Sequence, residues 1–325
     1  MNKTIQHYAE CILDGQLLQR PDIETLSELS KEHLDDLLYW ANQIRKANFG
    51  NQVRICSIVP GRLGGCSQDC AFCAQSIRYD TPVDKTPKTL SDEEIIAAAA
   101  EAKHKGVPNF GIVYSGRKVS DAELDRLIEL TKRIKSQLGL GVCMGLGVLD
   151  EASMQRLAAA GVSRFNHNLE TSRRHFKDIV TTHCYEDRVK TIQAALKAGL
   201  GVCAGGIFGI GETEDDRIDM AVELGRLGVD MVPMNFLHPI PGTPLGNTPA
   251  LPPREILRII ALYRFILPKT HLKVAGGRVL NLRDMQSWIF YAGCTSILTG
   301  NYLTTAGRAV EDDLRMLKDL GLETA

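Results

Sequence analysis

Short runs rich in β-branched and apolar residues alternate with longer segments of helical periodicity from about residue 48 onward. Such alternation is typical of βα units and indicates a parallel sheet. Eight runs have the composition of strands: VRICSIV, NFGIV, LGVCMGLG, VSRFNHN, LGVCAGGIFG, VDMVPMNFL, LKVAGG and TSILTG. They predict an α/β fold, a (β/α)8 TIM-type barrel with its active site at the C-terminal ends of the strands. A doubly wound open sheet is the alternative.

The segments between these runs carry helix start and stop signals. Ser91 with Glu94, and Ser120 with Glu123, form capping boxes. Residues 1–47 have a helical pattern, so we predict one domain over 1–325, with an N-terminal helical extension at 1–47 and the barrel at 48–325. The glycines expected at helix ends are Gly106, Gly139, Gly161, Gly199 and Gly228.

One internal similarity links two of the predicted strands. GLGVCMGLG at 139–147 recurs as GLGVCAGGI at 199–207, with the same Gly-Val-Cys core. In a barrel these segments are the third and fifth strands.

Charge and hydropathy indicate which kinds of binding partner this protein has. The 325 residues include 38 basic and 39 acidic side chains without a long run of one sign, which argues against nucleic-acid or membrane binding. The N-terminus lacks the apolar core of a secretory signal, and no stretch of about 18 apolar residues follows. We therefore expect a soluble, cytoplasmic protein with small-molecule ligands. Nine cysteines in such a chain favour metal or redox chemistry over disulfides.

Three of these cysteines, Cys66, Cys70 and Cys73, form a C-x3-C-x2-C array directly after the first predicted strand. Three thiolates can bind three irons of a [4Fe-4S] cube and leave the fourth iron open to a small molecule. Incidental buried thiols or a zinc loop are the alternatives, although a structural zinc site normally has a fourth protein ligand.

The cysteine array, with Phe72 inside it, resembles the signature of the radical S-adenosylmethionine (SAM) superfamily. The similarity to the biotin synthase family extends over almost the whole chain. The segments that carry it are GGCSQDCAFCAQSIRY, FNHNLETS, TTHCYEDRV, GGIFGIGET, PMNFLHPIPGTPL, AGGR and YLTTAG.

This resemblance implies the conversion of dethiobiotin to biotin, the last step of biotin biosynthesis. Carbon–hydrogen bonds of this kind are too strong for side-chain acids and bases, so a cofactor has to supply the chemistry. In the family, the reduced cluster cleaves SAM to a 5′-deoxyadenosyl radical, and an auxiliary iron–sulfur cluster donates the sulfur. The family also implies a reducing electron-donor protein and a homodimer.

The resemblance further implies a [2Fe-2S] auxiliary cluster held by three cysteines and an arginine. Cys143 and Cys203 match two of the cysteines and Arg278 matches the arginine, whereas Gly111 stands at the third cysteine position and offers no ligand.

Cys56 and Cys294 lie on predicted strands beside the barrel seam. Alternate strands share layers inside such barrels, so we hypothesise an altered auxiliary cluster, of a four-iron type, held by Cys56, Cys143, Cys203 and Cys294. In that case Arg278 is a neighbouring counter-charge and not a ligand. The alternative is that Cys56 and Cys294 are small buried hydrophobic residues.

Polar residues at strand ends define the expected pocket. By resemblance, Asn168 and Glu170 contact SAM and the substrate, and Arg188 pairs with the SAM carboxylate, a geometry that arginine suits. Strand alternation points His167 away from the pocket. Further expected contacts are Phe72, Tyr114, Ser115 and Ile207 for SAM, and Asn235 for dethiobiotin.

Two other functions remain open. One is a different radical SAM enzyme resembling biotin synthase, a maturase or mutase that does not donate sulfur. The other is a non-catalytic iron–sulfur carrier, which has no need of the SAM-binding set.

Overall fold

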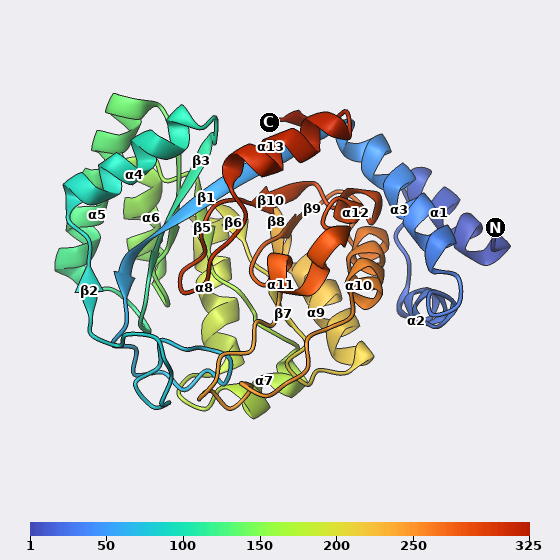
Figure 1. The fold of residues 1–325 in the computed structure, drawn as a ribbon, viewed down its shortest axis with the longest axis horizontal. Helices are drawn as coiled ribbons and strands as arrows, with labels where there is room; N and C mark the ends of the chain where they lie inside the picture. Colours follow the sequence, from blue (N-terminus) through green and yellow to red (C-terminus); the bar gives the residue numbers. More distant parts are fainter.

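Eight parallel strands close into a barrel in the computed structural model, which describes residues 1–325 (Figure 1). Each strand pairs with the next around the ring, and the last pairs with the first. This closure confirms the predicted barrel and rules out the open sheet. The barrel strands are β1 (Gln52–Leu63), β3 (Asn109–Tyr114), β4 (Gly141–Gly145), β5 (Arg164–Asn166), β6 (Gly201–Cys203), β8 (Met231–Phe236), β9 (His271–Val274) and β10 (Ser296–Leu298).

The fifth predicted strand is interrupted. It forms β6 and then β7 (Gly206–Phe208), which pairs with β8. At the break, a Cβ on Gly205 would lie 2.0 Å from the Pro233 carbonyl oxygen, so the backbones approach as only glycine permits. Two short strands add to β1: β2 (Lys88–Thr89) is antiparallel to its end, and β11 (Glu323–Thr324) is parallel to its start.

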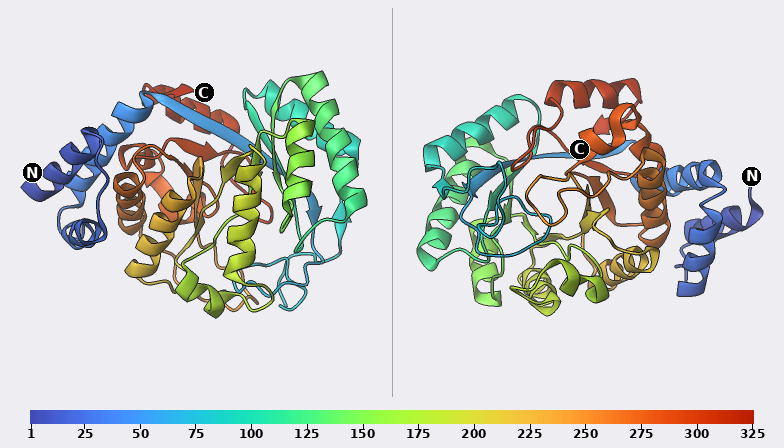
Figure 2. Two further views of the ribbon diagram at one scale, coloured as in Figure 1. Left: turned by 180° about the vertical axis from the view of Figure 1, so that it is seen from behind. Right: turned by 60° about the horizontal axis from the view of Figure 1, so that its bottom comes forward.

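Helices cover the outside of the barrel (Figure 2). Ser91 and Ser120 form the predicted capping boxes at the starts of α4 and α5, and Gly139, Gly161 and Gly228 are left-handed caps at helix ends. The surrounding helices are α4 (Asp92–His104), α5 (Asp121–Leu138), α6 (Glu151–Ala160), α7 (Arg173–Ile179), α8 (Tyr185–Lys197), α9 (Glu214–Leu227), α10 (Pro253–Ile266) and α13 (Val310–Asp319).

The N-terminal segment forms α1 (Lys3–Leu13), α2 (Arg20–Leu29) and α3 (Leu34–Phe49), which pack beside α10 (Figure 1). Between β9 and β10, the chain adds α11 (Arg278–Leu282), the 3-10 turn η1 (Arg283–Met285) and α12 (Trp288–Tyr291), which the sequence patterns did not predict. No helix has the length and apolar character needed to cross a membrane.

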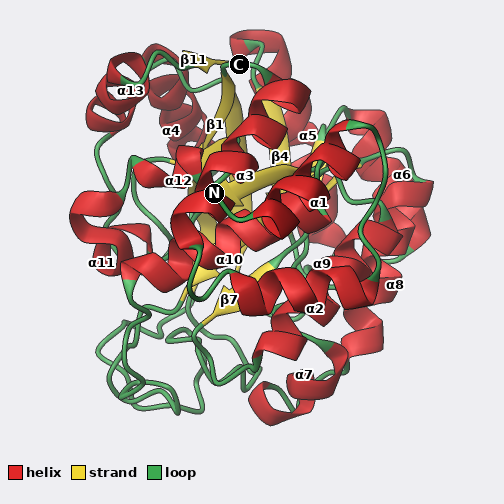
Figure 3. Ribbon diagram, turned by 90° about the vertical axis from the view of Figure 1, so that its right-hand side faces the viewer, coloured by secondary structure: helices red, strands yellow, loops and turns green.

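The two faces of the barrel strands differ in chemistry. Residues that face the helices are large, apolar and almost fully buried, including Phe110, Val142, Phe165, Val202 and Leu272. The alternate residues face the barrel axis and include glycine, cysteine, asparagine and lysine. Since many barrels of this type fill their centre with bulky aliphatic side chains, this lining leaves space for ligands. Figure 3 shows loops gathered at the end of the barrel near β7, where the C-terminal strand ends lie.

Candidate active site

The cysteines of the C-x3-C-x2-C array lie on one loop that leaves the C-terminal end of β1. The loop turns back on itself, and the Cys73 amide donates a 2.9 Å hydrogen bond to the Cys70 carbonyl. Gly64, two residues before Cys66, has a φ of 71°, and a Cβ there would lie 2.8 Å from the Lys85 carbonyl oxygen. The turn that positions the array therefore requires glycine.

Asp69 fastens this cysteine loop to the segment after α7. Its carboxylate accepts hydrogen bonds from the Thr181 and Thr182 amides at 3.0 and 3.1 Å. Partial burial acts to raise the pKa of Asp69, but the bonds from the threonines outweigh it and hold that pKa well below its usual value. His183 makes a second link, 2.9 Å from its Nδ1 to the Gln68 side-chain oxygen.

Cys66, Cys70 and Cys73 all line a cavity of 350 Å³ in the mouth of the barrel, called the upper cavity below. Burial raises the pKa of Cys70 to about 12 and that of Cys73 to about 11. These thiols therefore stay protonated at neutral pH unless a cation or metal centre stabilises the thiolates.

No three His, Cys, Asp or Glu side chains converge closely enough to hold a single metal ion. A four-iron cube makes a different demand, because each thiolate binds its own iron and the sulfurs stand farther apart than around one ion. Three thiols that line one cavity fit that group, and Cys66, Cys70 and Cys73 would hold it.

Asn168, Glu170 and Arg188 meet in the upper cavity as predicted. Arg188 Nη1 donates to the Asn168 carbonyl at 2.9 Å and to Glu170 Oε1 at 3.3 Å, and Asn168 Nδ2 donates to Glu170 Oε2 at 3.3 Å. Burial raises the pKa of Glu170, although the Arg188 charge opposes it. Arg188 Nε is buried without a partner, which leaves a donor for an anionic ligand group.

His183 completes this group and was not predicted. Its Nε2 accepts a 3.0 Å hydrogen bond from Arg188 Nη2. Burial, followed by the charge of Arg188, lowers the pKa of His183 to about 4, so the ring is neutral and can accept. His183 thus connects the cysteine loop with the arginine.

The prediction that His167 points away from the pocket is wrong, because His167 lines the upper cavity. β5 ends at Asn166, so strand alternation no longer fixes the direction of the next side chain. His167 is buried, its Nε2 has no partner, and burial lowers its pKa well below the usual value. The neutral ring is therefore available to a ligand.

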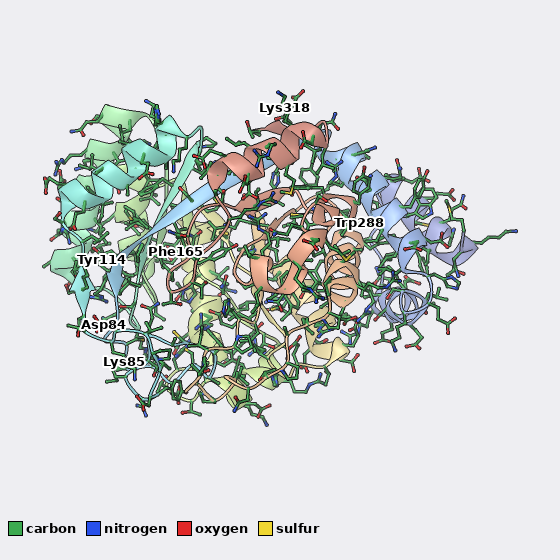
Figure 4. All side chains as sticks on the ribbon, viewed as in Figure 1. Asp84, Lys85, Tyr114, Phe165, Trp288 and Lys318 are labelled. Carbon is green, nitrogen blue, oxygen red and sulfur yellow. The ribbon has the colours of Figure 1, made fainter.

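The remaining predicted contacts surround this group. Phe72, Tyr114 and Ser115 line the upper cavity, and Ser115 Oγ also donates to the Gly64 carbonyl at 2.7 Å. Figure 4 labels Tyr114 near the end of β3. Ile207 does not reach the upper cavity and instead lines an adjoining cavity of 260 Å³.

Asn235 lines both cavities. Its Oδ1 accepts a 2.9 Å hydrogen bond from the Gly276 amide, and its Nδ2 donates to the Gly206 carbonyl at 3.1 Å. These bonds use one donor and one acceptor position, and a primary amide has a second of each for a ligand.

A second group of thiols lies deeper, on the inner face of the strands. Cys56, Cys143 and Cys203 come from β1, β4 and β6, and Lys273 from β9 joins them with its Nζ 3.6 Å from Cys56 Sγ. Gly111 pairs with Cys143 across β3 and β4, so it occupies the same layer. A Cβ there would lie 3.0 Å from Ile58 Cγ2.

Lys273 was not predicted, although a lysine inside the apolar run LKVAGG was the available signal. It is 8% exposed and has no carboxylate partner. Burial alone would lower its pKa, but the thiols of Cys203 and Cys56 outweigh this effect and raise it. The ammonium group therefore stays charged, and the groups that face it are cysteine sulfurs.

Two predicted members of the auxiliary site lie elsewhere. Cys294 is fully buried in the core, where its Sγ donates to the Ser296 carbonyl at 2.9 Å. Arg278 starts α11 outside the cavity and forms two hydrogen bonds to Asp313 of α13, at 3.0 and 2.6 Å. Both partners of this ion pair are fully buried, so Arg278 joins the C-terminal helix to the barrel.

Comparisons with known proteins identify the family. The Radical SAM superfamily profile matches residues 62–224, and the Biotin and Thiamin Synthesis associated domain matches residues 233–323. Biotin synthase of Heliobacterium modesticaldum is 46% identical over 322 residues, covering 99% of this chain and 98% of that protein. Biotin synthase of Geotalea uraniireducens is 43% identical over 327 residues, covering 100% and 99%.

Solved structures show the same fold at lower identity. A methylornithine synthase aligns with a TM-score of 0.84 and 23% identity over 98% of this chain and 97% of that one. The FeFe-hydrogenase maturase of Carboxydothermus hydrogenoformans aligns with a TM-score of 0.83 and 17% identity over 99% and 79%. The full-length matches at more than 40% identity decide the assignment: the chain belongs to the biotin synthase family of radical SAM enzymes.

Proposed function

We propose that this chain inserts sulfur into dethiobiotin to form biotin, and that its two cysteine groups hold the two clusters that the reaction needs. Its family establishes a radical SAM enzyme of biotin biosynthesis with a [4Fe-4S] cluster and SAM as cofactors. When bound, these cofactors supply a 5′-deoxyadenosyl radical that can abstract hydrogen from an unactivated carbon.

One observation carries the proposal. The upper cavity is lined at once by Cys66, Cys70 and Cys73 of the loop and by Cys203 and Lys273 of the inner layer. A substrate held in this cavity lies between the radical source and a sulfur source. An iron–sulfur carrier has no need of such a cavity.

The upper-cavity residues divide into two binding roles. Asn168, Glu170 and Arg188 hold SAM, with the unpartnered Arg188 Nε directed to its carboxylate. Phe72, Tyr114 and Ser115 complete the SAM contacts in the upper cavity, and Ile207 approaches SAM from the adjoining cavity. Asn168 and Asn235 hold dethiobiotin, whose ureido ring offers the donors and acceptors that a primary amide can match.

The inner layer holds the auxiliary cluster on Cys56, Cys143 and Cys203. Three thiolates can bind three irons of a four-iron cube and leave the fourth open. Gly111 offers no ligand at the third cysteine position of the family's [2Fe-2S] centre, and Arg278, at the arginine position, pairs with Asp313 instead. Lys273 Nζ lies 3.6 Å from Cys56 Sγ and donates to the sulfurs of this layer. We propose a four-iron auxiliary cluster, with an electron-donor protein, a cytoplasmic setting and a homodimer as in the family.

The decisive experiment is anaerobic incubation of reconstituted enzyme with dethiobiotin, SAM and a reductant. We expect biotin and 5′-deoxyadenosine together. Formation of 5′-deoxyadenosine without biotin would instead favour a maturase or mutase, and absence of SAM binding by calorimetry would favour a carrier. Mössbauer spectroscopy should count about eight irons per chain, whereas about six would contradict the four-iron auxiliary cluster.

A further inference from the structure

A second, smaller cavity lies on the other side of the inner cysteine layer, toward the N-terminal ends of the strands. Its volume is 20 Å³, and a polar cavity of roughly 10–15 Å³ holds one water. This cavity therefore has room for one molecule or ion about the size of a water. This floor cavity is lined by Arg54, Cys56, Cys143, Arg164, Lys273 and Ser296, among others.

The floor cavity contains hydrogen-bond donors without partners. Ser296 is fully buried and its Oγ has no hydrogen-bond partner. Arg164 Nε is buried and likewise has none, and the Ser57 hydroxyl is a third such group. Buried polar groups are nearly always satisfied by protein or by a bound species. Three unsatisfied groups around one small space indicate that a ligand belongs there.

The charge of the lining specifies an anion. Arg54, Arg164 and Lys273 all line the floor cavity, and no Asp or Glu does. Burial and the charge of Arg164 lower the pKa of Arg54, and the Asp230 carboxylate opposes them. Asp230 accepts the Val202 amide hydrogen at 2.6 Å and does not line the cavity. Lys273 is buried, and Arg54 and Arg164 are half-buried. Three partly or fully desolvated cations around one small space favour an anionic occupant.

The position of the floor cavity connects it to sulfur. Cys56 and Cys143 form part of its wall, and Cys203 and Lys273 separate it from the upper cavity. Arg54 is partly exposed at the strand ends and marks the side facing solvent. A small anion can therefore reach the thiol layer from below while SAM and substrate occupy the upper cavity.

We propose that the floor cavity binds hydrosulfide and supplies it to the auxiliary site. The proposal rests on the sulfur-donating function above, because each biotin carries away one sulfur that must be replaced. Hydrosulfide is already at the oxidation level of sulfide, so its entry needs neither oxidant nor reductant. Its single proton passes to water when the sulfur binds iron.

Isotope uptake tests this route directly. Reconstituted enzyme completes one turnover, then receives sodium [34S]sulfide, and mass spectrometry follows 34S in the protein-bound acid-labile sulfide. We expect Arg164→Met to take up label about tenfold more slowly, because it loses a charged donor to the anion. Ser296→Ala should also be slower. Arg156→Met, a surface arginine of α6 that is 45% exposed, is the matched control and should equal the wild type.

A second measurement needs no variant. Crystals of the reconstituted wild-type enzyme are soaked in sodium bromide, a monoanion of similar size, and an anomalous peak is expected between Arg164 and Ser296. Wild-type uptake rates in both cavity variants, or no bromide peak in the cavity, would overturn the proposal. Failure of the proposed function looks different, because the wild-type enzyme itself would then form 5′-deoxyadenosine without biotin, whatever the rate of label uptake.

Discussion

The ion pair between Arg278 and Asp313 allows a direct test of whether Arg278 belongs to the auxiliary cluster site. Both side chains are fully buried and make two hydrogen bonds. Replacing one partner leaves an uncompensated buried charge, which costs about 3–5 kcal/mol. We therefore expect Asp313→Asn and Arg278→Met each to lower the free energy of unfolding by about that amount, as measured by urea denaturation of the apoprotein. Because both lose the same interaction, the double variant should lose much less than the sum.

The same variants decide the role of the arginine in cluster binding. Neither should change the Mössbauer spectrum of the auxiliary cluster, since Arg278 lies outside both cavities that border the cysteine layer. As a control, Arg156→Ala breaks an exposed ion pair with Asp125 and should cost less than about 1 kcal/mol. A changed auxiliary spectrum in Arg278→Met, with an unchanged one in Asp313→Asn, would refute this reasoning and restore the arginine as a ligand.

Three further predictions address the site itself. Cys70→Ala should abolish 5′-deoxyadenosine formation and the SAM-binding cluster signal while the auxiliary signal persists; loss of both signals would contradict the separation of the two cysteine groups. Lys273→Met should lower the reduction potential of the auxiliary cluster, because a nearby positive charge favours the reduced form. Lys273→Arg keeps the charge and should have a potential close to that of the wild type. Equal potentials for Lys273→Met and the wild type in a redox titration would contradict this prediction. The unfolded chain protonates His183 near its ordinary pKa of about 6.5 but the folded chain only near 4, so stability should fall as pH drops through this window. His183→Gln should weaken that dependence in thermal melts, and an identical pH profile would exclude the effect.

The fold was predictable because its signals are local and repeated. Capping boxes at Ser91 and Ser120 and the period of the apolar runs each specify an element without tertiary information. Eight parallel strands, each followed by a helix, can then close into a barrel in few ways. The helices α11 and α12 carry no comparable signal, because each is five residues or shorter.

Family resemblance located Asn168, Glu170 and Arg188 beyond the strand ends, whereas strand alternation failed there, as at His167. The resemblance supplied Cys143 and Cys203, and the shared layers of alternate strands added Cys56 and Cys294. The structure groups Cys56 with Cys143 and Cys203 but places Cys294 in the core. Arg278 follows Gly277, whose φ of 75° turns the chain out of the strand, so alternation could not tell where it points. Lys273 was missed for a different reason: a buried lysine is unfavourable unless an anion faces it, and sequence alone did not show that the thiols would.

The division between the two faces of the barrel strands has a consequence for how such enzymes diversify. The apolar face that packs on the helices carries the stability, while the axial face carries the chemistry. Positions 56, 111, 143, 203 and 273 can then exchange glycine, cysteine, lysine or arginine with little repacking of the hydrophobic core. An exchange at Gly111 or Lys273 would therefore change the groups that face a cluster while the apolar face that packs on the helices keeps its contacts.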